Sequence, residues 1–263
     1  MKIRIGFAFI FCLLISSVLP AEMPDPLRQS TDYVKWYPAH YWNGFKGIGD
    51  VRFHRNLLIA GAIAIPVAFL LDDAVHDYVV EHGLYSSEIS QIGDLYGRRW
   101  GYIGGAGLVT LTGFMNGQSF KQTFSDVELL GEAVITEATI IELLKITSHR
   151  QRPNGANYHS FPSGHTGGSF TLAACLNEIY GKKVGIPAYA MATFVASSRI
   201  NDNKHYFSDV VTGAVVGTIV GKSFSREHHR LWTIQTSQSY RTSTVTISCN
   251  FDIHDGFSRT TPR

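Results

Sequence analysis

The chain has 263 residues, 44% of them hydrophobic, with 23 Lys and Arg against 21 Asp and Glu. This length suffices for one sizeable core, so a single catalytic domain is the default expectation. The near-neutral charge balance excludes the strongly basic surface that nucleic-acid binding requires. An anion would therefore be bound by a few placed charges and not by a bulk field.

The first 21 residues are typical of a secretory signal peptide. Lys2 and Arg4 precede the apolar run 5–15, and small residues follow up to Ala21. We therefore predict cleavage near Ala21 and export to a bacterial periplasm. A retained N-terminal anchor is the alternative, because Leu19 stands where a smaller residue is preferred.

Residues 22–54 form an aromatic-rich N-terminal region, which we predict to be irregular and packed on the domain as a lid. Most of its aromatic side chains crowd between residues 33 and 45. Tyrosine and tryptophan also favour the membrane interface. Segment 33–45 is therefore the part best suited to touch the edge of a bilayer.

The rest of the chain predicts an all-α bundle over residues 55–230, followed by a short β-hairpin in the tail 231–263. Glycines at every fourth position, Gly213, Gly217 and Gly221, indicate close packing of the last helix. The apolar, helix-like segments fall at roughly 55–80, 100–117, 127–148, 164–180, 184–199 and 205–222.

The apolar run from Leu57 to Leu71 is the strongest candidate for a membrane span after the leader. It has 15 residues and contains Pro66. At about 1.5 Å per residue it is shorter than the roughly 30 Å hydrocarbon core. The mean hydropathy of the whole chain is only +0.01. We therefore predict a core helix, and a mature protein that is soluble or peripherally membrane-associated.

Export would place Cys175 and Cys249 in an oxidising compartment, where they could pair. Cys175 lies in the segment FTLAACLNEI and has the surroundings of a small buried helix residue. The sequence leaves the pairing open and favours a free buried thiol.

Two sequence blocks combine helix ends with groups that suit an anion. In KITSHRQRP, Lys145 and Arg152 lie at or just after the end of a helix, where the helix dipole alone favours cations. In HSFPSGHTGG, Ser163 suits an N-cap, and Gly164 and His165 enter the first turn of a new helix. Backbone amides at such a start bind anions, although Ser-Gly is also an ordinary helix start.

A third block, SRINDNKHYFSD, places Arg199 at one helix end and His205 and Asp209 on the next helix. The spacing of four puts His205 and Asp209 on one helical face. Asp209 can then accept a hydrogen bond from one ring nitrogen and leave the other nucleophilic, although such a pair alone is more often a surface ion pair. Together, the three blocks predict a pocket for a tetrahedral dianion that faces a nucleophile and an acid.

The order of these residues resembles a family signature. It is Lys, six residues, Arg-Pro; then Pro-Ser-Gly-His; then Ser-Arg, five residues, His, three residues, Asp. This pattern is similar to that of the phosphatidic acid phosphatase type 2 superfamily, which also contains bacterial acid phosphatases and vanadium haloperoxidases. The resemblance covers about residues 125–222 and implies the helical-bundle fold of that superfamily.

The resemblance also implies roles for individual residues. His205 would attack phosphorus to form a phosphohistidine, Asp209 would orient it, and His165 would protonate the leaving alkoxide and then activate water. No metal cofactor is implied, because protein charges balance the phosphoryl group. We expect His149 and Arg150, which have no motif position, to lie beside the pocket or in solvent. The phosphate-binding groups would be Lys145, Arg152, Ser163, Gly164 and Arg199.

The leading hypothesis is an exported phosphatase that acts on a phosphomonoester or diphosphate, with a lipid phosphate favoured by the apolar helices. A soluble non-specific acid phosphatase would share the same site. A vanadium haloperoxidase is the alternative in which vanadate serves as cofactor instead of inhibitor, although such enzymes are usually much longer. An inactive bundle with a vestigial site is disfavoured by the intact motif. The leaving group and the oligomeric state are not determined by the sequence.

Overall fold

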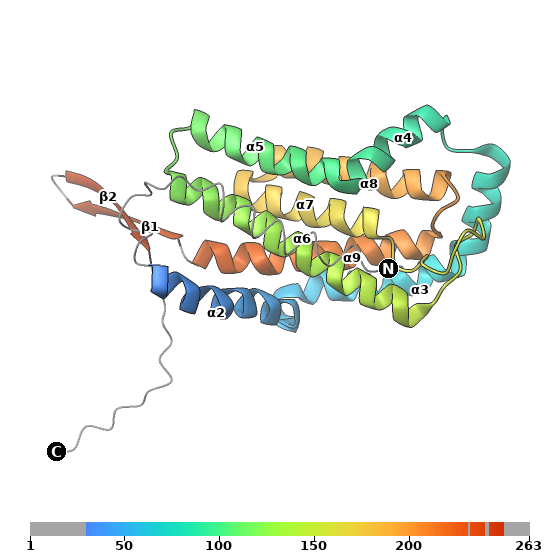
Figure 1. Ribbon diagram of the computed structural model, residues 1–263, viewed down its shortest axis with the longest axis horizontal. Coiled ribbons are helices and arrows are strands. Elements are labelled where there is room, and N and C mark those ends of the chain that lie inside the picture. The colour runs from blue at the N-terminus through green and yellow to red at the C-terminus, as the bar shows by residue number, and fades with distance from the viewer. Residues whose placement is uncertain (1–29, 231, 240–241, 250–263) are drawn as a thin grey trace, which may run out of the picture.

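The computed structural model describes residues 30–230, 232–239 and 242–249. Residues 30–230 form an all-helical bundle, as predicted, whose long helices run roughly along the long axis of the molecule (Figure 1). The helices are α2 (Ser30–Ile48), α3 (Val51–His82), α4 (Ser87–Leu95), the π-helical turn η2 (Tyr96–Trp100), α5 (Gly101–Met115), α6 (Phe120–Ser148), α7 (Gly164–Tyr180), α8 (Lys182–Asn201) and α9 (Phe207–Arg230).

Two strands follow the bundle, β1 (Trp232–Ser239) and β2 (Thr242–Cys249). They pair antiparallel with Trp232 opposite Cys249. Their side chains lie outside the described residues, so the packing of the expected C-terminal hairpin stays a prediction. In α7, Cys175 is a free and fully buried thiol, and burial raises its pKa to about 12.

The prediction that the N-terminal region is irregular is wrong for its described part, because residues 30–48 form α2. Tyr37, Tyr41 and Phe45 recur every four residues, a helical spacing that the polar and aromatic composition obscures. Tyr41 packs on Phe224 of α9 with ring centroids 5.5 Å apart, and its hydroxyl lies 2.7 Å from that of Thr136 in α6. The segment is therefore an integral helix of the bundle.

The prediction that Leu57–Leu71 forms a core helix is also wrong. This run belongs to α3, in which Ile63 is 64% exposed and Leu70 is 83% exposed. Among the described residues, α3 is the one helix long and apolar enough to cross a membrane, with a mean hydropathy of 2.0 over its best 18-residue window. The length argument counted only the run that ends at Leu71, whereas the whole helix extends from Val51 to His82.

Glycines allow α7 and α9 to approach closely, as their four-residue spacing predicts. A Cβ atom on Gly213 would lie 2.5 Å from the carbonyl oxygen of Ser163, and one on Gly217 would overlap the carbonyl oxygen of Gly167. Gly221 continues the same row one turn further along α9. No side chain fits at Gly217 unless the helices separate.

We predict that Gly217→Val lowers the free energy of unfolding by about 3 kcal/mol, because the new side chain forces the two backbones apart. Gly131→Ala is the matched control, since a Cβ at this helical position meets nothing within 4 Å. The control should gain roughly 0.5–1 kcal/mol from helix propensity. Thermal unfolding of both variants measures the difference, and an unchanged melting temperature for Gly217→Val would contradict the close packing.

Candidate active site

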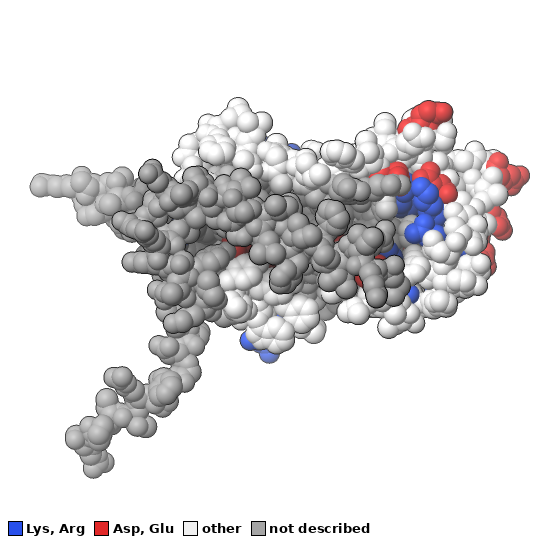
Figure 2. Space-filling model, in the orientation of Figure 1, with Lys and Arg blue, Asp and Glu red and all other residues white. Residues whose placement is uncertain are grey.

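One end of the bundle gathers the ends of three helices. Here α6 ends at Ser148, α7 begins after its N-cap Ser163, and α9 begins at Phe207. Figure 2 shows Lys and Arg side chains beside Asp and Glu at this end of the molecule. The three sequence blocks lie on these helix ends and on the loops that join them.

The ring of His205 is buried and held in one tautomer. Its Nδ1 lies 2.7 Å from the carbonyl oxygen of Ser160 and 3.5 Å from Oδ2 of Asp209. A carbonyl oxygen only accepts, so Nδ1 carries the proton and Nε2 keeps its lone pair. Ser160 is therefore the nearer orienting group, and sequence reasoning, which assigned this role to Asp209, missed it.

Asp209 is fully buried and accepts several hydrogen bonds. Its Oδ2 accepts from the Ser160 hydroxyl at 2.5 Å and the Tyr206 amide at 2.8 Å, and its Oδ1 accepts from Arg150 at 2.8 Å. Burial alone would raise the pKa of Asp209, but hydrogen bonds from His205 and Ser160 outweigh it and hold the pKa below its usual value. A buried carboxylate thus stays ionised behind the histidine.

Arg150 links this carboxylate to α3. Its guanidinium binds Asp209 at 2.8 Å and Oδ2 of Asp72 at 2.6 Å, and it lies 4.2 Å from the ring centre of Tyr206. Asp72 in turn accepts from the backbone amide of Ser208 at 2.7 Å. Arg150 thus lies beside the pocket, which is one of the two positions expected from the sequence. Asp72 was not anticipated, and its only sequence signal is a carboxylate that directly follows an apolar run.

The expected anion-binding groups surround the start of α7. A Cβ on Gly164 would lie 3.4 Å from the ammonium nitrogen of Lys145, so this cation lies beside the α7 amides. The hydroxyl of Ser163 accepts from the backbone amide of Thr166 at 3.5 Å, as an N-cap does. Burial lowers the pKa of Arg152, and the positive charge of Arg199 acts in the same direction.

The charges around His205 also shift the pKa of its ring. Burial lowers it below the usual value of about 6.5, and Asp209 acts in the opposite sense. The positive charges of Arg152 and Lys145 lower it further. Burial and the two cations therefore favour the neutral form of the His205 ring.

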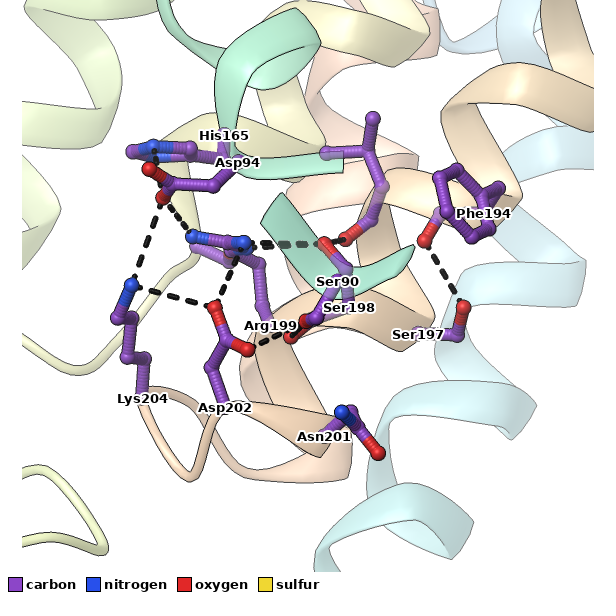
Figure 3. Close-up of polar contacts among 12 residues, drawn as sticks. Ser90, Asp94, His165, Phe194, Ser197, Ser198, Arg199, Asn201, Asp202 and Lys204 are labelled. Atoms are coloured by element: carbon purple, nitrogen blue, oxygen red, sulfur yellow. Dashed lines mark hydrogen bonds and ion pairs between the residues drawn. The ribbon is translucent and has the colours of Figure 1, made fainter. Parts of the chain in front are cut away.

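A second acidic group lies between His165 and Arg199 (Figure 3). Asp94, near the end of α4, pairs with the buried Arg199 guanidinium, and its Oδ1 lies 3.4 Å from Nε2 of His165. Lys204 approaches Asp94 at 3.5 Å and Asp202 at 3.2 Å. Burial opposes ionisation of Asp94, but Arg199 and Lys204 lower its pKa to about 2.

Sequence reasoning missed Asp94 because α4 carries no motif and lies far from the three blocks in the chain. It also missed Asp202, the residue that caps the C-terminus of α8, whose carboxylate binds Arg199 at 2.9 Å. Only a folded chain shows that α4 packs on α8 and brings Asp94 to the site.

The structure brings all the predicted site residues into one connected group. The backbone amide of Ser163 donates to the carbonyl oxygen of Asp209 at 3.0 Å, and that of His205 donates to the carbonyl oxygen of Arg199 at 3.3 Å. The first of these bonds joins the second block to the third, and the other lies within the third block. The connected residues are Lys145, Arg152, Ser163, Gly164, His165, Arg199, His205 and Asp209.

Comparison with known proteins identifies the class. Residues 127–232 match the family model of the PAP2 superfamily, and this part of the chain belongs to that superfamily. The match contains every predicted site residue. It also shows the family membership that the motif pattern predicts.

Two relatives carry named activities. A lipid A 1-phosphatase of Porphyromonas gingivalis is 40% identical over 81 residues, which are 30% of this chain and 18% of that protein. A lipid A 4'-phosphatase of Helicobacter pylori is 32% identical over 66 residues, which are 25% of this chain and 33% of that protein. The chain thus matches a third or less of each relative's length.

A solved structure is also similar, the crystal structure of Aquifex aeolicus LpxE. It is 22% identical in sequence, and the likeness covers 55% of this chain and 89% of that chain with a TM-score of 0.41.

The charges around His205 predict its titration. Its pKa should lie below about 6.5, and Asp209→Asn should lower it further, because the Asp209 carboxylate stabilises the protonated ring. Asp73→Asn, which changes an exposed carboxylate on α3, is the control that should leave the value unchanged. Histidine NMR titration, assigned with His205→Gln, measures the shift. A pKa that rises in Asp209→Asn would contradict this electrostatic description.

Proposed function

We propose that the chain is a phosphatase that transfers a phosphoryl group first to His205 and then to water. The observation that supports this most directly is the buried His205 ring, whose Nδ1 is committed to the Ser160 carbonyl oxygen at 2.7 Å. The positive charges of Lys145 and Arg152 lie close enough to the ring to lower its pKa. A neutral imidazole in a site for anions is suited to attack phosphorus.

In the first step, Nε2 of His205 forms a bond to phosphorus while the bond from phosphorus to the leaving oxygen breaks. His165 gives its proton to that oxygen. In the second step, water attacks the phosphohistidine and His165 accepts the proton of the water, which releases phosphate and restores His205. Asp94, with its Oδ1 3.4 Å from His165, can balance the charge of the protonated His165 ring.

The phosphoryl oxygens would be held by the cations around the start of α7 and by its backbone amides. Lys145, Arg152 and Arg199 supply the positive charge that metal ions supply in other phosphatases. We therefore propose that phosphoryl transfer itself needs no metal ion and that orthovanadate inhibits it. The named activities of the two relatives favour hydrolysis over vanadium-dependent halide oxidation.

We further propose that the substrate is a lipid phosphate. The relatives are named for activity on lipid A. The continuous apolar run of α3 ends at Leu71, and the next residue, Asp72, accepts a hydrogen bond from the backbone amide of Ser208 at the start of α9. The site thus lies level with the boundary between an apolar flank and a polar end. A membrane lipid can place its acyl chains along this flank and its phosphate at His205.

The same exposed surface supports membrane attachment through α3. Its apolar side chains would be solvated if the protein were soluble, which costs about 25 cal/mol per Å² of apolar surface. Contact with lipid removes this cost. Export to the periplasm, predicted from residues 1–21, remains part of the proposal.

The test compares phosphate release from a lipid phosphate in mixed micelles with release from the same phosphorylated headgroup lacking acyl chains. We expect kcat/KM for the lipid to be higher by roughly tenfold or more, since binding of the chains contributes about 1.4 kcal/mol or more. His205→Ala is the negative control, and His82→Gln, on an exposed side chain, is the matched control. Equal values for the two substrates would refute the lipid assignment.

Retention in the membrane is read from the same preparation. The protein should stay with membranes after a carbonate wash and require detergent for release. Release by the wash alone would contradict insertion of α3 and leave only peripheral contact.

A further inference from the structure

A second polar cluster lies at the opposite end of the bundle from the candidate active site. It contains His40 of α2, Glu132 of α6 and His228 of α9, and each is at most 5% exposed. Helix α9 packs against both α2 and α6, and Figure 1 shows that its C-terminal end lies where the strands begin. His228 follows Asp209 by 19 residues of α9, so the two lie about 28 Å apart along the helix.

Three donor atoms converge in this cluster. Nε2 of His228 lies 3.0 Å from Oε2 of Glu132, Nε2 of His40 lies 3.4 Å from the same oxygen, and the two Nε2 atoms lie 3.1 Å apart. Zinc binds histidine nitrogen and carboxylate oxygen at about 2.0–2.2 Å in tetrahedral geometry, which places neighbouring donor atoms about 3.3 Å apart. The three separations therefore match three corners of one zinc coordination sphere.

No protonation state of the two histidines explains these short distances well. If both rings were doubly protonated, two N–H groups would point at each other across 3.1 Å, with one carboxylate to balance two buried positive charges. If one Nε2 has no proton, it can accept a hydrogen bond from the other Nε2 across 3.1 Å, but its lone pair also lies beside the Glu132 carboxylate. A divalent cation satisfies both nitrogens and the carboxylate together.

The surroundings of the cluster favour the metal-binding form of the ligands. The Ser125 hydroxyl lies 3.2 Å from Nδ1 of His228, so Nδ1 can donate to it and leave Nε2 free to bind a metal, as in many metal sites. Oε1 of Glu132 is buried and has no hydrogen-bond partner within the part of the chain that the structure describes. This oxygen is available as a further donor atom.

We propose that His40, Glu132 and His228 form a binding site for a divalent transition-metal ion, with Zn²⁺ as the expected occupant. The ligands come from three helices, so the ion would fasten α2 to α6 and α9. The site is structural, because the reacting groups lie about 28 Å away at the other end of α9. It is independent of the proposed phosphatase activity.

Metal content of the full-length protein, purified without a polyhistidine tag, tests the proposal. After removal of metals with chelator, incubation with Zn²⁺ and desalting, we expect about one zinc per chain by mass spectrometry and a higher melting temperature. Glu132→Gln and His228→Gln should lose this zinc and the rise in melting temperature. His82→Gln, which changes an exposed histidine of α3, should retain both.

A spectroscopic measurement keeps the test decisive if a variant folds poorly. Co²⁺ added to the metal-free wild-type protein should give the intense visible absorption of a tetrahedral site, and Zn²⁺ should displace it. Wild-type protein that holds no zinc, or variants of Glu132 and His228 that hold as much as the wild type, would overturn the proposal.

The two proposals can fail separately. Folded Glu132→Gln protein should still release phosphate in the presence of chelator, since the reacting end of the bundle does not use this cluster. If the variant keeps its zinc, the metal site is wrong. If the variant is folded, lacks zinc and loses its turnover, the site is not merely structural and the metal-independent chemistry is wrong.

Discussion

The close contact between α7 and α9 fixes the relative positions of the groups in the candidate active site. Glycines on both helices bring the backbones together, and the amide of Ser163 donates to the carbonyl oxygen of Asp209 at 3.0 Å. The N-terminus of α7 is thereby held beside His205. A shift of one helix would separate His205 from the amides and cations that we propose bind the phosphoryl group, and misplacement of this kind is costly for catalysis.

Buried charges complete the site, and those of Asp209, Arg150 and Asp72 are paired with one another. Asp209 is balanced by Arg150 and by the hydrogen bonds of Ser160, and Arg150 is balanced in turn by Asp72. Removing one partner from such a network leaves an uncompensated charge in a region of low dielectric constant, which costs several kcal/mol. The network also ties α3, the helix with the exposed apolar surface, to the start of α9. The same network therefore connects the helix that we propose contacts the membrane with the residues around His205.

The sequence predicted the parts of the site that depend on local spacing. Ser163 and Gly164 follow from N-cap chemistry, and His205 and Asp209 follow from a helical spacing of four. Asp94 could not be predicted in the same way, because its position depends on the packing of α4 against α8. The ligands His40, Glu132 and His228 are similarly scattered, and no spacing rule connects three different helices.

Two errors in the predicted fold have related causes. Residues 30–48 form α2 although their composition is polar and aromatic, because packing of Tyr41 on Phe224 decides the structure. The run Leu57–Leu71 was assigned to the core because apolar residues are usually buried. Composition states that a face is apolar, but it does not state whether protein or lipid covers that face.

Identification of the phosphorylated residue tests the central claim most directly, namely that His205 is the nucleophile in a pocket built by α6, α7 and α9. A phosphate ester with an activated leaving group, labelled in the phosphate, should label the His165→Ala protein, because loss of the acid and base slows hydrolysis of the intermediate more than its formation. The label should be acid-labile, stable in base and located on His205 by peptide mass spectrometry. Label on any other residue, or label trapped on His205→Ala protein, would contradict the claim.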